Sequence, residues 1–83
     1  MVPRQAATQI TVLPLELQVG DHLDDDKNHV WIVMGRPFTT DAGRTVHVRV
    51  VRAHDLGLTE IRSWGVRERV DVRRTASAEE KKR

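Results

Sequence analysis

The sequence predicts an all-β domain, a small five-stranded antiparallel sheet that curls or closes into a barrel. Apolar and polar residues alternate with a period of two in most segments, which is typical of strands that bury one face. Turn-forming residues recur at short intervals along the 83-residue chain. A sheet of so few short strands has little face area, and curling buries its apolar face and removes free edges.

The clearest strand is expected over residues 44–53, RTVHVRVVRA. Val46, Val48 and Val50 alternate there with polar residues, so they predict a buried face. A Gly-containing turn precedes the segment and another follows it, at residues 41–43 and 54–57.

Two strands are expected before this segment. Residues 10–13 form a short one, and Pro14 confines its pairing to an edge of the sheet. Residues 29–35, HVWIVMG, are the most apolar stretch and are apolar on both faces, as in a strand that is buried on both sides or that crosses a closed barrel. Residues 38–40 resume this strand after a break at Pro37.

Two more strands are expected at residues 58–64 and 66–74, so the domain covers residues 10–74. Residues 1–9 have no apolar pattern and residues 75–83 are polar, and both are expected to be disordered tails. A chain of this length supports one domain with a small core. It contains no Cys, so disulfides cannot supplement that core.

Composition and motifs exclude several classes of function. No apolar run is long enough for a transmembrane helix, and residues 1–17 lack the continuous apolar segment of a signal peptide. We therefore expect a cytoplasmic protein without a membrane partner, and the absence of Cys fits a reducing compartment. There is no Gly-rich phosphate loop, and no cofactor is expected.

Two groups of residues are candidates for metal binding or catalysis. The segment HLDDDKNH, residues 22–29, has metal-ligand residue types, but its Asp residues are consecutive and it lacks the Gly of a Ca²⁺ loop. It predicts a solvated turn with no metal, and the alternative is a metal site or an acidic contact with a partner. His47 and His54 would need a fixed nucleophile or carboxylate, and Ser63 lacks a nucleophile-elbow context. We expect no enzyme.

Basic residues are concentrated in one part of the chain. The formal net charge is only +2, yet nine of the eleven Arg fall within residues 35–74. If the last three strands are neighbours, their outward faces merge into one binding surface. Interspersed Glu60, Glu68 and Asp71 would neutralise much of it, so a merely solvated face is the alternative. The candidate binding residues are Arg44, Arg49, Arg52, Arg62, Trp64, Arg67, Arg69 and Arg73.

Trp64 lies between Arg62 and Arg67 and has two interpretations. It is either an apolar lid over an open barrel end, or an exposed ring that stacks on a base or anchors a protein partner. Trp31, inside the most apolar segment, is expected in the core.

The segment LQVGDHL, residues 17–23, resembles the L-x-x-G-D-x-L pattern that begins many small SH3-like barrels. A Trp-bearing strand, a Gly-tipped hairpin and a short last strand follow, so the resemblance covers residues 15–73. The chain is also similar to small uncharacterised proteins of actinobacteria and their phages. SH3-like barrels include peptide binders, nucleic-acid modules and assembly domains, so the resemblance implies a fold. With three aromatic residues the chain departs from proline-peptide grooves and methyl-lysine cages.

These observations predict a non-catalytic binding module that acts in protein–protein interaction or assembly, such as a phage or actinobacterial accessory protein. The alternative is nucleic-acid binding through the Arg-rich face of residues 44–74 with Trp64. A protein partner is expected rather than DNA or RNA, because the charge is near balance and aromatic residues are few. Homo-oligomerisation through residues 10–13 is a third alternative.

Overall fold

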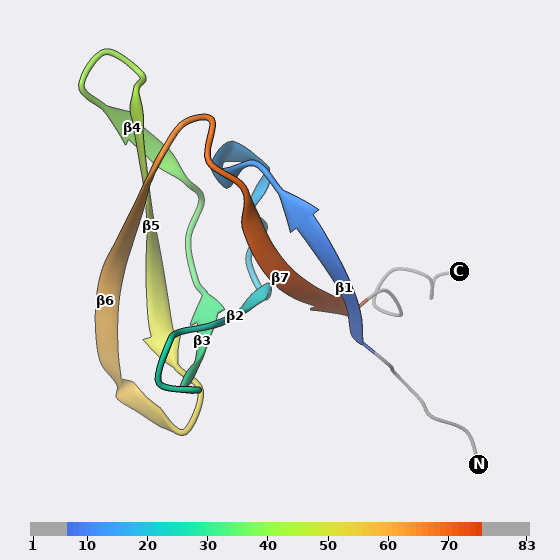
Figure 1. The fold of residues 1–83 in the computed structure, drawn as a ribbon. Coiled ribbons are helices and arrows are strands. Elements are labelled where there is room, and N and C mark those ends of the chain that lie inside the picture. The colour runs from blue at the N-terminus through green and yellow to red at the C-terminus, as the bar shows by residue number, and fades with distance from the viewer. Residues whose placement is uncertain (1–6, 76–83) are drawn as a thin grey trace, which may run out of the picture.

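The computed structural model describes residues 7–75, in which seven strands and one turn of 3-10 helix follow one another (Figure 1). The elements are β1 (Ala7–Val12), η1 (Pro14–Glu16), β2 (His22–Asp24), β3 (Val30–Val33), β4 (Phe38–Thr40), β5 (Thr45–Arg52), β6 (Asp55–Gly65) and β7 (Val70–Thr75). The predicted all-β class is confirmed. Over the described residues, no helix has the length and apolar character needed to cross a membrane.

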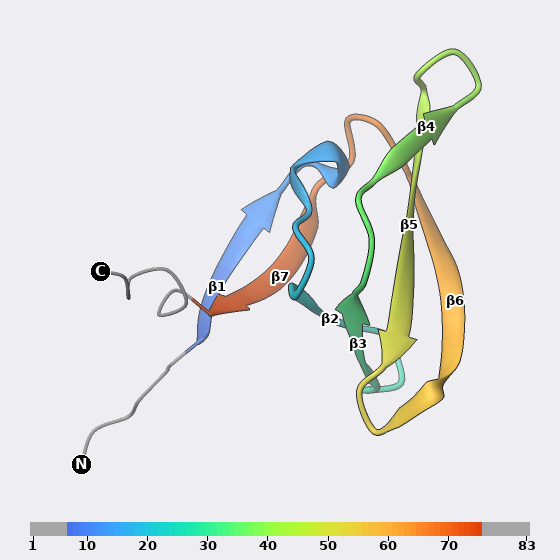
Figure 2. The same ribbon diagram turned by 180° about the vertical axis from the view of Figure 1, so that it is seen from behind.

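The strands form one antiparallel sheet in the order β1-β7-β2-β3-β5-β4, and β6 pairs with the other edge of β5. The sheet curls strongly into a half-barrel, as Figures 1 and 2 show from opposite sides. Within residues 7–75, β6 pairs only with β5, whereas β7 pairs with β1 and β2. The curled sheet therefore stays open between β6 and β7.

The strand boundaries differ from the expected ones in several places. β6 begins at Asp55 and so includes most of the turn expected at residues 54–57, and β7 begins at Val70 rather than at residue 66. Residues 22–24 and 38–40 are separate short strands, β2 and β4, so the sheet has seven strands rather than five. β1 begins at Ala7, so residues 7–9 belong to a strand and not to a tail. β1 does lie at the edge of the sheet, as Pro14 predicts. The expected disordered tails otherwise fall on residues 1–6 and 76–83, outside the described residues.

The core lies on the concave side of the sheet. In β5 the predicted alternation is confirmed, because Val46, Val48 and Val50 are each 0% exposed. The main cluster comprises Val12, Leu17, Leu23, Trp31, Val33, Val48, Val50, Val70 and Val72. The two-sided burial expected for residues 29–35 is wrong. Trp31 and Val33 are buried but Met34 is 46% exposed, because no second layer covers the outer face of this single sheet.

A charged pair lies beside this core. Asp21, in the turn before β2, is 1% exposed, and Arg74 on β7 donates from Nε and Nη2 to its two carboxylate oxygens at 2.8 Å each. The second oxygen also accepts the Gln18 backbone N–H at 2.9 Å. Hydrogen bonding to Asp21 raises the pKa of Arg74, so the guanidinium stays charged. This pair ties the last strand to a turn 53 residues earlier.

We predict that Arg74→Met lowers the free energy of unfolding by about 3–5 kcal/mol, because it leaves a buried carboxylate without its cation. The matched control is Arg73→Met. Arg73 pairs with Asp24, whose side chain is 54% exposed, and such a pair contributes about 0–1 kcal/mol. Urea unfolding followed by circular dichroism measures both values. Equal losses in the two variants would contradict a special role for the Asp21–Arg74 pair.

Candidate functional site

The fold divides the predicted arginine face between the two sides of the sheet. Arg49 is exposed and lies on the convex side. In the strand register Arg62 is opposite buried Val48, and Arg52 is opposite buried Trp31. Because residues paired across a ladder face the same side, Arg52 and Arg62 belong to the concave side.

The remaining candidate arginines lie outside the β5–β6 hairpin. Arg44 and Arg67 are in exposed turns, and Arg69 is exposed just before β7. Arg73, on β7, is partly buried and binds Asp24 at 2.7 Å. The condition for one merged arginine surface, that the last three strands are neighbours, is not met, because β7 pairs with β1 and β2 instead of β6. The sheet therefore does not merge these arginines into one face.

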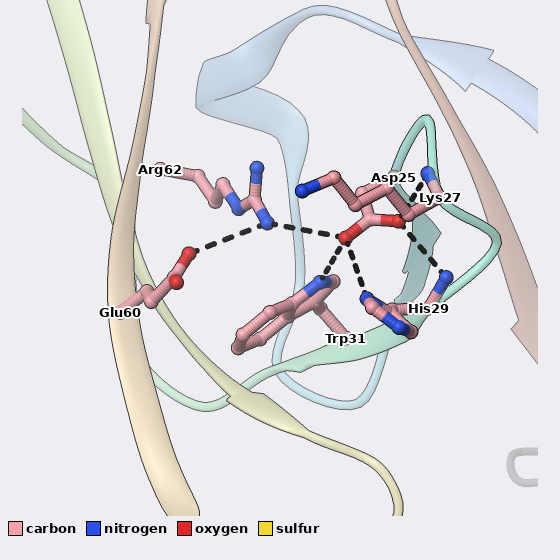
Figure 3. A network of polar contacts seen from close by, with 6 residues as sticks. All are labelled: Asp25, Lys27, His29, Trp31, Glu60 and Arg62. Atoms are coloured by element: carbon pink, nitrogen blue, oxygen red, sulfur yellow. Dashed lines mark hydrogen bonds and ion pairs between the residues drawn. The ribbon is translucent and has the colours of Figure 1, made fainter.

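Trp31 belongs to a polar network at the open side of the sheet, and the contacts of this network converge on Asp25 (Figure 3). The Trp31 ring is 3% exposed, and the guanidinium carbons of Arg52 and Arg62 lie 5.6 and 4.9 Å from its centroid. Such cation–π contacts are worth about 0.5–2 kcal/mol, depending on desolvation. The indole Nε1–H donates to Asp25 at 3.0 Å. Trp31 is thus a core residue, as expected, and two of the candidate arginines cover it.

Asp25 holds the loop between β2 and β3. Its carboxylate accepts the backbone N–H groups of Lys27 and His29 at 2.8 and 2.9 Å, in addition to the Trp31 indole. Arg62 lies 3.8 Å from the same carboxylate and 3.3 Å from Glu60 (Figure 3). The indole hydrogen bond, followed by the two backbone hydrogen bonds, holds the pKa of Asp25 well below its usual range.

This network corrects the prediction of a merely solvated turn at residues 22–29. The Asp25 side chain is only 13% exposed and has a structural role. Within residues 7–75 no three His, Cys, Asp or Glu side chains are grouped so that they could hold a metal ion. The sequence signal that could have indicated this role is an Asp able to form an Asx turn, in which its carboxylate accepts nearby backbone N–H groups, with a Trp six residues later.

A cleft of about 350 Å³ opens on the concave side between β6 and β7. Four apolar residues line its wall, and charged residues of both signs complete its lining. These residues are Leu23, Trp31, Trp64, Val70, Asp24, Asp25, Arg62, Arg69 and Asp71.

Trp64 fits both interpretations given to it. It lies opposite buried Val46 in the β5–β6 ladder, and its half-buried ring packs against the core. The same ring lines the cleft, where part of it remains open to solvent. Trp64 therefore packs against the core and also exposes part of its ring in the cleft.

On the convex side, His47 contacts two hydroxyl groups, and neither contact was predicted from the sequence. Its Nδ1 lies 2.7 Å from Ser63 Oγ and its Nε2 lies 2.6 Å from Thr40 Oγ1. The Phe38 ring stacks on the imidazole at a centroid distance of 5.1 Å. In nucleophilic triads a carboxylate orients the histidine base, whereas here the second ring nitrogen faces another hydroxyl.

Comparisons of the chain with protein-family models, curated proteins and solved structures found no match. The resemblance to SH3-like barrels and to phage or actinobacterial proteins therefore stays a prediction.

We predict that Trp31→Phe raises the Asp25 pKa toward the ordinary aspartate value of 3.8, because the variant lacks the indole N–H. In the native protein this depressed pKa makes the carboxylate stabilising above about pH 4, and the contribution is lost as the pH falls through the folded-state pKa. Carboxyl NMR shifts of Asp25, followed during acid titration, measure the change.

Trp64→Phe is the control, since Trp64 donates no hydrogen bond to Asp25 in the structure. An Asp25 titration that is the same in native protein and Trp31→Phe would refute the assigned cause.

Proposed function

We propose that this chain is a non-catalytic protein-interaction module whose partner docks in the cleft between β6 and β7. The observation that carries the proposal is the composition of that cleft: an apolar wall with Trp64, and a rim that holds Arg69 and Asp71. Its volume of about 350 Å³ suits one or two apolar side chains of a partner polypeptide. The cytoplasmic location expected from the sequence belongs to the same proposal.

Trp64 is the proposed anchor of the interface. Interface energy concentrates in a few residues, and Trp and Arg are the residue types most enriched among them. The ring is already packed against the core, so binding costs little further side-chain entropy. Arg69 and Asp71 at the rim can then pair with charges of either sign on the partner.

The charge pattern favours a protein over a nucleic acid. Nucleic-acid affinity depends on cations that neutralise phosphates. Here Arg62 contacts Glu60 and Asp25, and Arg73 contacts Asp24. A phosphate backbone entering the cleft would also meet the carboxylates of its rim. The arginines that the alternative function requires are thus already engaged, or lie on separate faces of the sheet.

We predict that Trp64→Ala weakens the binding of cleft-directed peptides at least tenfold, which corresponds to about 1.4 kcal/mol. The peptides would be selected on the native protein from a displayed random library and measured by calorimetry. Phe38→Ala is the matched control, because Phe38 is an aromatic residue that is 50% exposed and stacks on His47. Dispersed amide spectra establish that both variants fold. Equal affinity of native protein and Trp64→Ala would remove the cleft as the binding site.

The nucleic-acid alternative has its own test. Short single- and double-stranded DNA is titrated into labelled protein at about 50 and about 300 mM salt, because counterion release makes phosphate binding strongly salt-dependent. We expect no amide shifts in residues 44–74 at either salt concentration. Shifts in these residues that vanish at the higher concentration would establish the alternative instead.

A further inference from the structure

β6 is the longest strand and lies at an edge of the sheet. Eight of its 11 residues pair with β5 on one side, and among residues 7–75 nothing pairs with its other side (Figure 1). Three of its aliphatic side chains are strongly exposed: Leu56 by 69%, Leu58 by 39% and Ile61 by 48%. Unpaired edges are usually protected by Pro or Lys, and residues 55–65 contain neither. Such an edge is a template for another strand.

The backbone direction identifies which residues would pair. Alternate residues of a strand point their N–H and C=O groups to opposite edges. The Val66 N–H, just after β6, donates to the Arg44 carbonyl, so the backbone groups of even-numbered residues of β5 point toward β6. The Met34 N–H, just after β3, donates to the Arg49 carbonyl, so the backbone groups of odd-numbered residues point toward β3. In the β5–β6 register the even-numbered residues oppose residues 60, 62 and 64. Residues 59, 61 and 63 therefore turn their backbone groups to the open edge.

We propose that β6 pairs with β6 of a second copy of this chain, antiparallel, about a two-fold axis at Ile61. In this register Ile61 lies opposite Ile61 of the second copy. Glu60 lies opposite Arg62, and Thr59 opposite Ser63. Residues 59, 61 and 63 then form the hydrogen-bonded pairs, as their backbone direction requires.

Charge complementarity selects this register. An axis at Glu60 would set two carboxylates opposite each other, and an axis at Arg62 would set two guanidinium groups opposite each other. Only the axis at Ile61 pairs the two opposite charges. Glu60 already contacts Arg62 of its own strand at 3.3 Å, so the four side chains of a dimer alternate in sign. A two-fold contact of this kind joins two copies and does not extend to a third, because it uses the unpaired edge of β6 in both.

The side chains also match on both faces of the paired strands. On the convex side, exposed Ile61 meets its own copy. On the concave side, Leu58 of one copy comes opposite Trp64 of the other, next to the cleft. This pairing does not depend on the proposed binding function of the cleft, since it follows from the β6 edge alone.

The first experiment is sedimentation equilibrium of the whole chain over a wide range of protein concentrations. We expect the 9.5 kDa chain to reach twice this mass with increasing concentration. Ile61→Lys, which sets two like charges at the axis, should raise the dissociation constant at least tenfold. Leu15→Lys is the matched control, because Leu15 is 51% exposed and lies outside β6. It should leave the dissociation constant unchanged.

The second experiment tests the register. The chain has no Cys, so single cysteines can be introduced. Ile61→Cys should form a disulfide-linked dimer under oxidised glutathione, because hydrogen-bonded antiparallel pairs have Cα atoms about 5.5 Å apart, within disulfide range. Thr59→Cys should not crosslink with itself. Mixed with Ser63→Cys protein, it should give a mixed dimer.

Two outcomes would overturn the proposal. One is a native protein that remains monomeric up to about 1 mM, an affinity too weak for a stable pair. The other is a dimer that survives Ile61→Lys, which would assign the contact to another surface such as the β1 edge around residues 10–13.

Discussion

β5 buries Val46, Val48 and Val50 completely, and the other strands are arranged around that face. The curled sheet buries mainly one of its two sides, so alternation decides the side of residues 59–65, which pair with β5 before the irregularity at Val51/Arg52. This constraint sends Arg62 and Trp64 to the concave side and leaves Arg49 and His47 on the convex side. A register slip of one residue would exchange these sets, and with them the cleft and the Trp31 network.

The open side of the half-barrel is covered by charged side chains rather than by another strand. Arg52 and Arg62 lie over Trp31, while Asp25 satisfies its indole N–H. Long cationic side chains can cover an apolar ring with their stems and still keep their charge near water. This gives Arg52 and Arg62 a structural role that does not require a nucleic-acid partner.

Much of the fold was predictable from the sequence, and most of the site was not. Alternation predicted the class and the buried valines, and Pro14 predicted an edge strand, because these signals are local. The partners of Asp21 and of His47 depend on strand register across long sequence separations, which no local pattern specifies. The position of β7 also depends on long-range register, since β7 pairs with β2 and β1 and not with β6, which precedes it in the chain.

The pairing of β1 with β7 has a consequence for how the chain acquires its structure. Ala7 lies opposite Thr75 and Val12 opposite Val70, so this ladder joins the first described strand to the last. Contacts between residues so distant in sequence slow folding, because the loop between them must close first. During synthesis β1 leaves the ribosome before β7 and stays unpaired until β7 emerges. The β5–β6 hairpin, which is local, can form in that interval and serve as the nucleus on which the late strands assemble.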